Sequence, residues 1–110
     1  MQIKKILFIL ILCLASISAF AAGDYEAGKV KAYTCTGCHG IAGYKNTYPM
    51  YHVPRIGGQN VEYLVIALQG FKSGERKHST MNLQAEALSE QDIQDIAVYL
   101  AAQTNTPGAE

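Results

Sequence analysis

The pentapeptide Cys35-Thr36-Gly37-Cys38-His39 constrains this chain more than any other part of its sequence. On a helical turn the two cysteines, three residues apart, share a face, and His39 follows four residues after Cys35. Two thiols placed in this way can add to the two vinyl groups of a single haem, while the adjacent imidazole reaches the iron. The motif is the signature of c-type haem attachment. We therefore predict one covalent haem c, with Cys35 and Cys38 as thioether anchors and His39 as the proximal iron ligand.

Three other uses of a Cys-x-x-Cys pair fit this sequence less well. A thioredoxin-like redox pair follows a strand in a βαβ pattern, whereas residues 24–33 have the pattern of a helix. A structural zinc site needs four ligands, usually from a second pair at similar spacing, and His52 and His78 are at the wrong separation. A disulfide between residues three apart closes almost no loop and would stabilise little.

The N-terminal residues 1–21 have the pattern of a secretory signal peptide. Lys4 and Lys5 form a basic start, residues 6–14 are an unbroken apolar run, and Ala19-Phe20-Ala21 offers small residues at a cleavage site. The apolar run is shorter than the roughly 20 residues that span a bilayer. We predict cleavage after residue 21, export to the periplasm, and one monohaem domain over residues 22–110. An uncleaved N-terminal anchor is the alternative.

Length and charge exclude several classes of protein. With 110 residues the chain is too short for a TIM barrel, a Rossmann enzyme or a kinase. Nine Lys and Arg balance nine Asp and Glu, so the basic excess of a nucleic-acid-binding protein is missing. Because the apolar residues are concentrated in residues 1–21, the remainder has the composition of an ordinary soluble domain. We expect no integral membrane span after signal cleavage.

Three helices are predicted around the motif, and no strong strand signal is present, so the expected fold class is all-α. The first helix runs from an Asp24 cap into the Cys35 turn. The second follows an Asn60 cap and ends before Gly74. The third begins at Ser89, where Ser89 and Asp92 resemble a capping box. Apolar residues at helical spacing support the second and third helices: Val61, Leu64, Val65, Leu68 and Phe71, then Ile93, Ile96, Ala97 and Leu100.

A haem held by His39 needs a sixth ligand unless it binds an external molecule. A thioether is a soft ligand that favours Fe(II), and His/Met ligation is found in cytochromes c of raised potential. Met81 lies in the middle of a predicted loop over residues 72–88 and is the preferred candidate. Met50 and His52, in the loop over residues 40–58, and His78 remain alternatives.

At this point the chain resembles the class I c-type cytochromes, in particular small bacterial monohaem members and single halves of dihaem periplasmic cytochromes. The resemblance spans residues 24–103, effectively the whole chain after the signal segment. The matching pieces stand in order along the sequence: Gly28, residues 35–40, residues 53–59 (VPRIGGQ), residues 62–64, residues 71–74, Met81, residues 88–89 and Tyr99.

The resemblance implies a class I cytochrome c fold, with about three main helices around one covalently bound haem. It implies Met81 as the distal iron ligand and the Pro54 carbonyl as the acceptor of the His39 Nδ1 proton, which fixes the ring. It also implies a close crossing of the first and last helices at Gly28, against Tyr99 or Leu100. One departure is that Gln84 stands where many relatives have a second distal methionine.

A six-coordinate haem leaves one-electron exchange as its chemistry, so we predict a periplasmic electron carrier that is not itself an enzyme. Its partners would be a redox donor and acceptor, which include membrane redox complexes to which it could dock. Lys72, Arg76 and Lys77 are a candidate docking cluster for an acidic partner. Two alternatives are the haem subunit of a periplasmic oxidoreductase complex and a gas-binding or peroxidatic haem protein.

Overall fold

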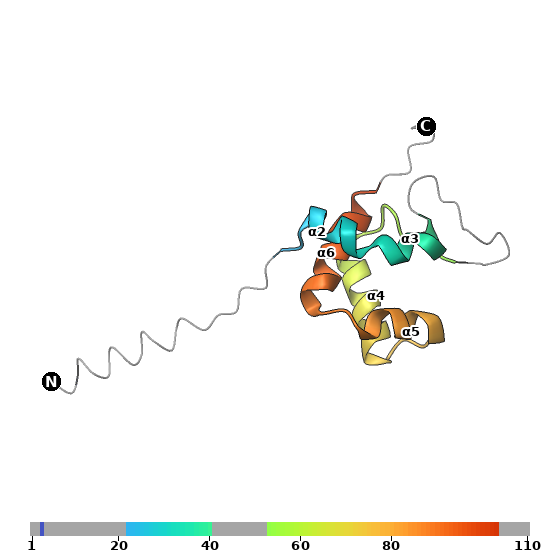
Figure 1. The fold of residues 1–110 in the computed structure, drawn as a ribbon. Coiled ribbons are helices and arrows are strands. Elements are labelled where there is room, and N and C mark those ends of the chain that lie inside the picture. The colour runs from blue at the N-terminus through green and yellow to red at the C-terminus, as the bar shows by residue number, and fades with distance from the viewer. Residues whose placement is uncertain (1–2, 4–21, 41–52, 104–110) are drawn as a thin grey trace.

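A computed structural model describes residues 3, 22–40 and 53–103, and all the regular structure in this part of the chain is helical (Figure 1). The all-α prediction is confirmed. The predicted signal segment, apart from Ile3, lies outside the described residues, as do Met50, His52 and the tail from residue 104. None of the described helices is long and apolar enough to cross a membrane. The helices that follow residue 22 are α2 Tyr25–Lys31, α3 Tyr33–His39, α4 Val61–Ser73, α5 Ser79–Glu86 and α6 Glu90–Ala101.

Helices α4 and α6 begin at the caps predicted from the sequence. The Asn60 side chain accepts a hydrogen bond from the Tyr63 N–H at 3.1 Å. Ser89 and Asp92 form a reciprocal capping box, with hydrogen bonds of 3.1 and 2.8 Å. Helix α4 ends at Gly74, whose φ of +78° is a left-handed conformation that glycine adopts without strain. These two helices are confirmed, because their capping signals are local in sequence.

The predicted first helix is divided in two at Ala32, so the expectation of one continuous helix was wrong. The Ala32 N–H still donates to the Gly28 carbonyl at 2.8 Å. The Ala32 carbonyl then accepts from both Cys35 and Thr36, at 3.0 and 3.3 Å. The chain therefore changes direction between α2 and α3 within a single residue, without an intervening loop.

The predicted loop over residues 72–88 contains an additional helix, α5, which is a second correction. His78 caps it, with the imidazole Nδ1 accepting from the Met81 N–H at 3.3 Å. Met81 therefore lies in the first turn of a helix rather than in the middle of a loop. Histidine is not among the preferred capping residues, so the sequence carried little signal for this start.

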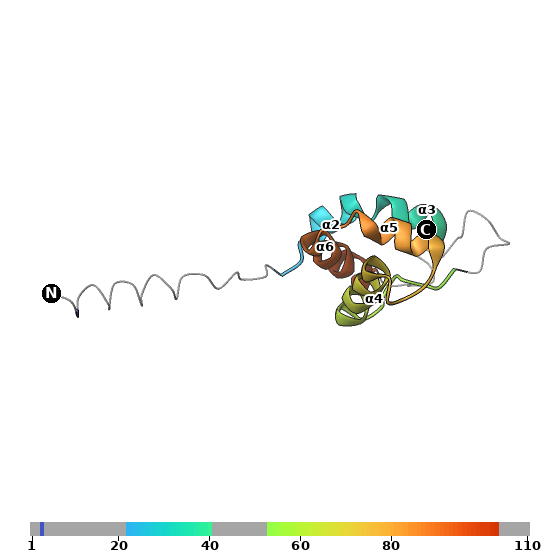
Figure 2. The same ribbon diagram turned by 90° about the horizontal axis from the view of Figure 1, so that it is seen from below.

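Helix α6 is the centre of the fold, since it packs against both α2 and α4. Figure 2, turned by 90° from Figure 1, shows α6 beside α2 with α4 below them. Helix α4 also contacts α5, whereas α3 makes its only contact between described helices with α2. The buried apolar cluster joins α4, α6 and the junction of α2 with α3 through Ala32, Leu64, Ile96, Ala97 and Leu100.

Helices α2 and α6 cross with almost no space between their backbones. A Cβ at Gly28 would lie 2.0 Å from the Asp95 carbonyl oxygen and 2.8 Å from the Tyr99 Cβ. No side chain fits there, because the Asp95 backbone belongs to a buried helix and cannot move aside. The Tyr25 and Tyr99 rings continue the contact, with centroids 5.3 Å apart. The predicted crossing at Gly28 is thus present, and Asp95 is its closest neighbour.

An ion-pair network closes the same crossing. Lys31 Nζ lies 2.6 Å from the Asp95 carboxylate and 2.7 Å from that of Asp92. Asp95 is buried, and its carboxylate also accepts from the Asp24 N–H at 2.7 Å. The hydrogen bond from Lys31 lowers the pKa of Asp92 to about 2. The pKa of Asp95 is lowered by the Asp24 N–H and by Lys31, and the two aspartates raise the pKa of Lys31.

Candidate haem site

The two motif cysteines lie on one turn of α3, a short helix that is tied together by its own polar groups. The Thr36 hydroxyl donates to the Tyr33 carbonyl at 2.7 Å. Gly40 ends the helix with φ of +57°, and its N–H donates to the Thr36 carbonyl at 3.0 Å. Both thiols are free. The helical turn therefore presents the two sulfurs three residues apart, at the spacing that the attachment motif requires.

The two thiols have different surroundings. Cys35 is half-buried and packs against the apolar cluster between α4 and α6. Burial raises the pKa of the Cys35 thiol, so this group is uncharged at neutral pH. Cys38 is exposed. One of the two sulfurs therefore lies beside the protein core, and the other lies at the surface of α3.

His39 is the one buried residue of α3, with 7% of its surface exposed. Its Nδ1 lies 2.8 Å from the Pro54 carbonyl oxygen. Because a carbonyl oxygen only accepts, Nδ1 must carry the proton, and the lone pair of the ring is then on Nε2. A neutral imidazole held in one orientation with a free Nε2 is the form in which histidine binds a metal.

The segment that carries Pro54 is fastened to the end of α6. The Gly58 N–H donates to the Leu100 carbonyl at 2.9 Å, and Gly58 adopts a φ of +76°. Within the turn, the Gln59 side chain donates to the Arg55 carbonyl at 3.0 Å. The segment that contains Pro54 is thereby attached to α6, the helix at the centre of the core. The Pro54 carbonyl in turn restrains the orientation of the His39 ring.

Met81 lies on α5, which packs on α4 and not on α3. Its side chain is half-buried. The neighbouring Asn82 makes three hydrogen bonds, to the Phe71 carbonyl, the Arg76 carbonyl and the His78 N–H. Sequence reasoning did not identify Asn82, because each of these partners is a backbone group and an asparagine in a predicted loop carries no further signal.

Only part of the candidate docking cluster of Lys72, Arg76 and Lys77 is free to contact a partner, because some of its groups interact within the protein. Lys72 donates to the Leu88 carbonyl and lies 3.5 Å from Glu90, so it links α4 to the start of α6. The Arg76 guanidinium lies over the Phe71 ring, 4.7 Å from its centroid. Lys77 is exposed. Arg76 is exposed as well, so Arg76 and Lys77 carry the positive charge of this cluster that faces solvent.

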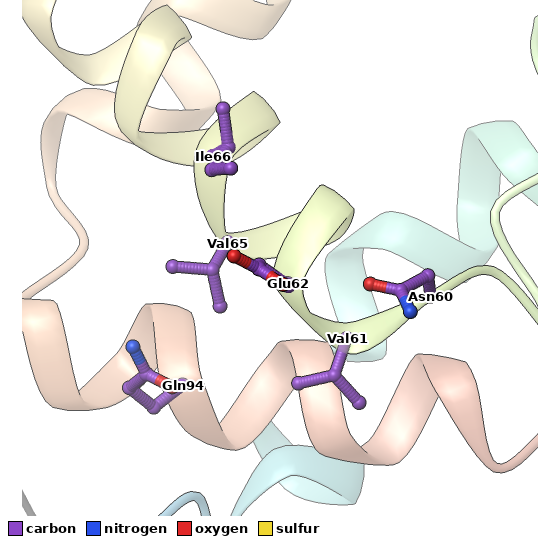
Figure 3. Close-up of a pocket in the computed structure, with 6 residues that line it drawn as sticks. All are labelled: Asn60, Val61, Glu62, Val65, Ile66 and Gln94. Carbon is purple, nitrogen blue, oxygen red and sulfur yellow. The ribbon is translucent and has the colours of Figure 1, made fainter.

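A shallow, mostly apolar groove lies elsewhere, between α4 and α6 (Figure 3). It is open to solvent, and Gln94 is the only residue that α6 contributes. None of the predicted haem-site residues lines this groove, so it is separate from the site built by α3 and Pro54. Its lining residues are Asn60, Val61, Glu62, Val65, Ile66 and Gln94.

Comparison with known proteins relates this arrangement to one family. The family model described as "Cytochrome c" matches residues 25–104. The chain is 36% identical to cytochrome c4 of Stutzerimonas stutzeri over 115 residues, which cover 96% of this chain and 53% of that protein. It is 39% identical to cytochrome c-554(548) of Halomonas halodenitrificans over 85 residues, covering 74% of this chain and 99% of the relative.

A solved structure agrees with the sequence comparison. The crystal structure of reduced recombinant cytochrome c4 from Pseudomonas stutzeri superposes with a TM-score of 0.65 at 36% identity. The match covers 77% of this chain and 48% of that one. The chain thus spans about half the length of the cytochromes c4 that it matches. The predicted all-α class I cytochrome c fold is confirmed by this superposition.

Proposed function

Because this chain belongs to the cytochrome c family, which implies covalently bound haem c, we propose that it is a one-electron carrier. In this proposal Cys35 and Cys38 hold the haem as thioethers, and His39 and Met81 are the axial iron ligands. The contact of 2.8 Å between His39 Nδ1 and the Pro54 carbonyl carries the proposal most directly. This contact supports a His39 ring whose Nε2 is free to bind a metal, and two free thiols precede His39 on the same helix.

The residues present fit such a group by their chemistry. Two free thiols that can form thioether bonds to the porphyrin, with an imidazole and a thioether as iron ligands, are the groups used for covalent haem of the His/Met type. When bound, the haem supplies reversible one-electron oxidation and reduction at its iron. The protein's part is to keep the same ligands in both oxidation states. The hydrogen bond from His39 to Pro54 supports this, because an oriented ring does not rearrange when the iron charge changes.

The local order of α5 supports the proposal that Met81 is an iron ligand. The His78 side chain accepts a hydrogen bond from the Met81 N–H at 3.3 Å, the Met81 side chain is half-buried, and α5 packs on α4. A soft thioether would favour Fe(II) and so raise the reduction potential. With both axial positions filled by side chains, external ligands and substrates would have no open coordination position. This favours electron transfer over catalysis.

We further propose that the protein works in the periplasm. The signal-like segment of residues 1–21 supports export, with residues 22–110 as the mature monohaem domain. Its partners would then be redox proteins that donate and accept one electron. The matched cytochromes c4 are about twice as long as the region that matches this chain. The carrier role is therefore proposed from this one domain, and not from the activity of those longer proteins.

The test is the Met81→Ala variant, compared with Leu83→Ala on the same helix, whose side chain is 69% exposed. Met81→Ala should lower the reduction potential. It should also increase apparent carbon monoxide affinity of the reduced protein by about tenfold or more, because the thioether no longer competes. Leu83→Ala should match the parent in both measurements.

Two results would contradict the proposal. A parent protein that already binds carbon monoxide readily would favour the gas-binding or peroxidatic function. An unchanged potential and spectrum in Met81→Ala would assign the sixth position to another residue, and variants of Met50, His52 and His78 would then identify it.

A further inference from the structure

Asn82 uses every hydrogen-bonding group of its amide on backbone atoms. Its Nδ2 donates to the Phe71 carbonyl at 2.7 Å and to the Arg76 carbonyl at 2.8 Å. Its Oδ1 accepts from the His78 N–H at 2.9 Å. The three contacts join the end of α4, the connecting segment and the start of α5. We call these three hydrogen bonds the Asn82 clamp.

Helix α5 depends on contacts outside itself, which are its packing on α4 and the Asn82 clamp. It has eight residues, and an isolated helix of this length is not stable in water. Ala85 is its only buried residue. Its N-terminal cap is a histidine with a long hydrogen bond of 3.3 Å. The position of α5 therefore depends on contacts beyond its own backbone, and the clamp supplies three of them.

The segment on the other side of the clamp is itself fixed. The Arg76 N–H donates to the Gly70 carbonyl at 2.9 Å, and the Arg76 guanidinium lies over the Phe71 ring. The two carbonyls that receive Asn82 are thus anchored to α4. A side chain bonded to both of them has little freedom to move, and this restrains the backbone on either side of it.

We propose that Asn82 is a positioning residue that holds the Met81 thioether at the iron. This rests on the proposed ligand role of Met81, and it adds a residue that touches neither haem nor iron. Met81 and Asn82 are adjacent on the first turn of α5, so a shift of the Asn82 backbone moves the Met81 Cα with it. When the clamp is broken, the thioether leaves the iron more often.

The chemistry of the clamp distinguishes it from simple space filling. Asn82→Asp keeps the shape and the acceptor for the His78 N–H, but it replaces two N–H donors with an oxygen. That oxygen would face two carbonyl oxygens, which repel it. Asn82→Ala removes all three hydrogen bonds without introducing repulsion. If the donors are decisive, the aspartate variant should be at least as impaired as the alanine variant.

The experiment measures carbon monoxide binding and reduction potential in the haem-loaded protein. Asn82→Ala and Asn82→Asp should each bind carbon monoxide about tenfold faster than the parent, consistent with the loss of two or three hydrogen bonds. Their potentials should shift in the same direction as that of Met81→Ala. Gln84→Ala is the matched control, since Gln84 is an exposed polar residue on the same helix. Thermal unfolding would verify that each variant is folded.

The outcomes separate the two proposals. If Met81→Ala changes binding and potential but both Asn82 variants behave like Gln84→Ala, the clamp does not position Met81 and this inference is overturned. If Met81→Ala changes neither, the ligand assignment fails first and the positioning role fails with it.

A measurement on the unmodified protein keeps the inference testable even if the Asn82 variants do not fold. The two side-chain amide protons of Asn82 should exchange slowly with solvent in an NMR experiment on the folded protein, since both are hydrogen-bonded. Exchange as fast as that of the exposed Gln84 amide would show that the clamp is not closed in solution, and would overturn the inference.

Discussion

Helices α6 and α3 are held in place by different means. Helix α6 has five buried residues among twelve and packs on both α2 and α4. Helix α3 has one buried residue among seven, His39; its backbone lies close only to α2 among the described helices, and Cys35 packs on the edge of the apolar cluster. Its sequence, YTCTGCH, offers few apolar side chains with which to form a core. What holds its far end is the contact between His39 and Pro54.

The difference indicates that one region serves mainly stability and the other mainly haem binding. The crossing of α2 and α6 is stabilised by side chains and ion pairs that belong to the protein. The α3 region instead presents thiols and an imidazole, the groups that we propose bind the haem. We therefore expect substitutions at the crossing to change stability, and substitutions at α3 to change haem attachment and redox behaviour.

The largest effect is expected from Cys35→Ala/Cys38→Ala, which tests whether the α2–α6 region can fold without the haem. A domain of this size has a marginal core, and losing the haem should remove its net stability of about 5 kcal/mol or more. Circular dichroism should show little cooperative helix. Acid–organic extraction should leave haem on the parent chain and none on the variant.

Thr36→Ala is the control for this variant, because it changes the same turn and keeps both thiols. It should retain covalent haem and a cooperative transition. A sharp thermal transition in the haem-free double variant would contradict this prediction, because it would show that the protein core folds without haem.

The next largest effect is expected at the helix crossing. Gly28→Ala should destabilise the protein by about 3 kcal/mol, because the new methyl group would overlap the Asp95 carbonyl and force α2 away from α6. Gly37→Ala on α3 is the matched control, since nothing lies within 4 Å of its Cβ position. It should be neutral or stabilising by about 0.5 kcal/mol. Denaturant unfolding measures both, and equal losses would refute the contrast between the regions.

A smaller effect, of about 2 kcal/mol, is expected for Asp95→Asn, which weakens the network of Lys31, Asp92 and Asp95. The pKa values of Asp92 and Asp95 are lower in the folded protein than the usual value of about 3.9. Their contribution is therefore present above about pH 4 and is lost as pH falls toward about 2, the folded pKa of Asp92. In Asp95→Asn the loss of stability over this interval should be smaller than in the parent.

Glu86→Gln, on the exposed face of α5, is the control for the acid measurement. It should leave the slope of unfolding free energy against pH nearly unchanged between pH 4 and 2. If Asp95→Asn keeps the full slope of the parent, the network at the crossing is not the source of the acid sensitivity.

The smallest effect concerns the exposed charge of the candidate docking cluster. Lys77→Glu should slow electron transfer to ferricyanide, an anionic probe, by about twofold at low ionic strength. Lys29→Glu changes the net charge equally but lies on α2. It should have a weaker effect, measured by stopped-flow absorbance over a range of salt concentrations. Equal slowing by both variants would show that only net charge matters.

The sequence predicted the parts of the fold whose signals are local. Asn60 and the pair of Ser89 and Asp92 marked the starts of α4 and α6 within three residues of each helix. The break at Ala32 was missed because the helical pattern continues through it. Helix α5 was missed because it begins at a histidine and is held by Asn82, whose partner Phe71 is eleven residues away.

The candidate site was predicted unevenly for the same reason. The spacing of Cys35, Cys38 and His39 is a local pattern, so the sequence alone indicated haem attachment. The Pro54 carbonyl was expected only through resemblance to a family, because a backbone oxygen fifteen residues away leaves no trace in composition or periodicity. The roles of the cysteines, His39, Pro54 and Met81 remain predictions, and Asn82 could be found only once the backbone was in view.

The pairing of α2 with α6 also bears on the order in which the domain is assembled. Lys31 and Asp95 are separated by 64 residues, and Asp24 and Asp95 by 71. Contacts between such distant residues require closure of a long loop, which slows folding. During synthesis α2 and α3 emerge well before α6, the partner on which α2 rests. The Cys35–His39 turn is consequently accessible on a nascent chain whose core has not yet closed.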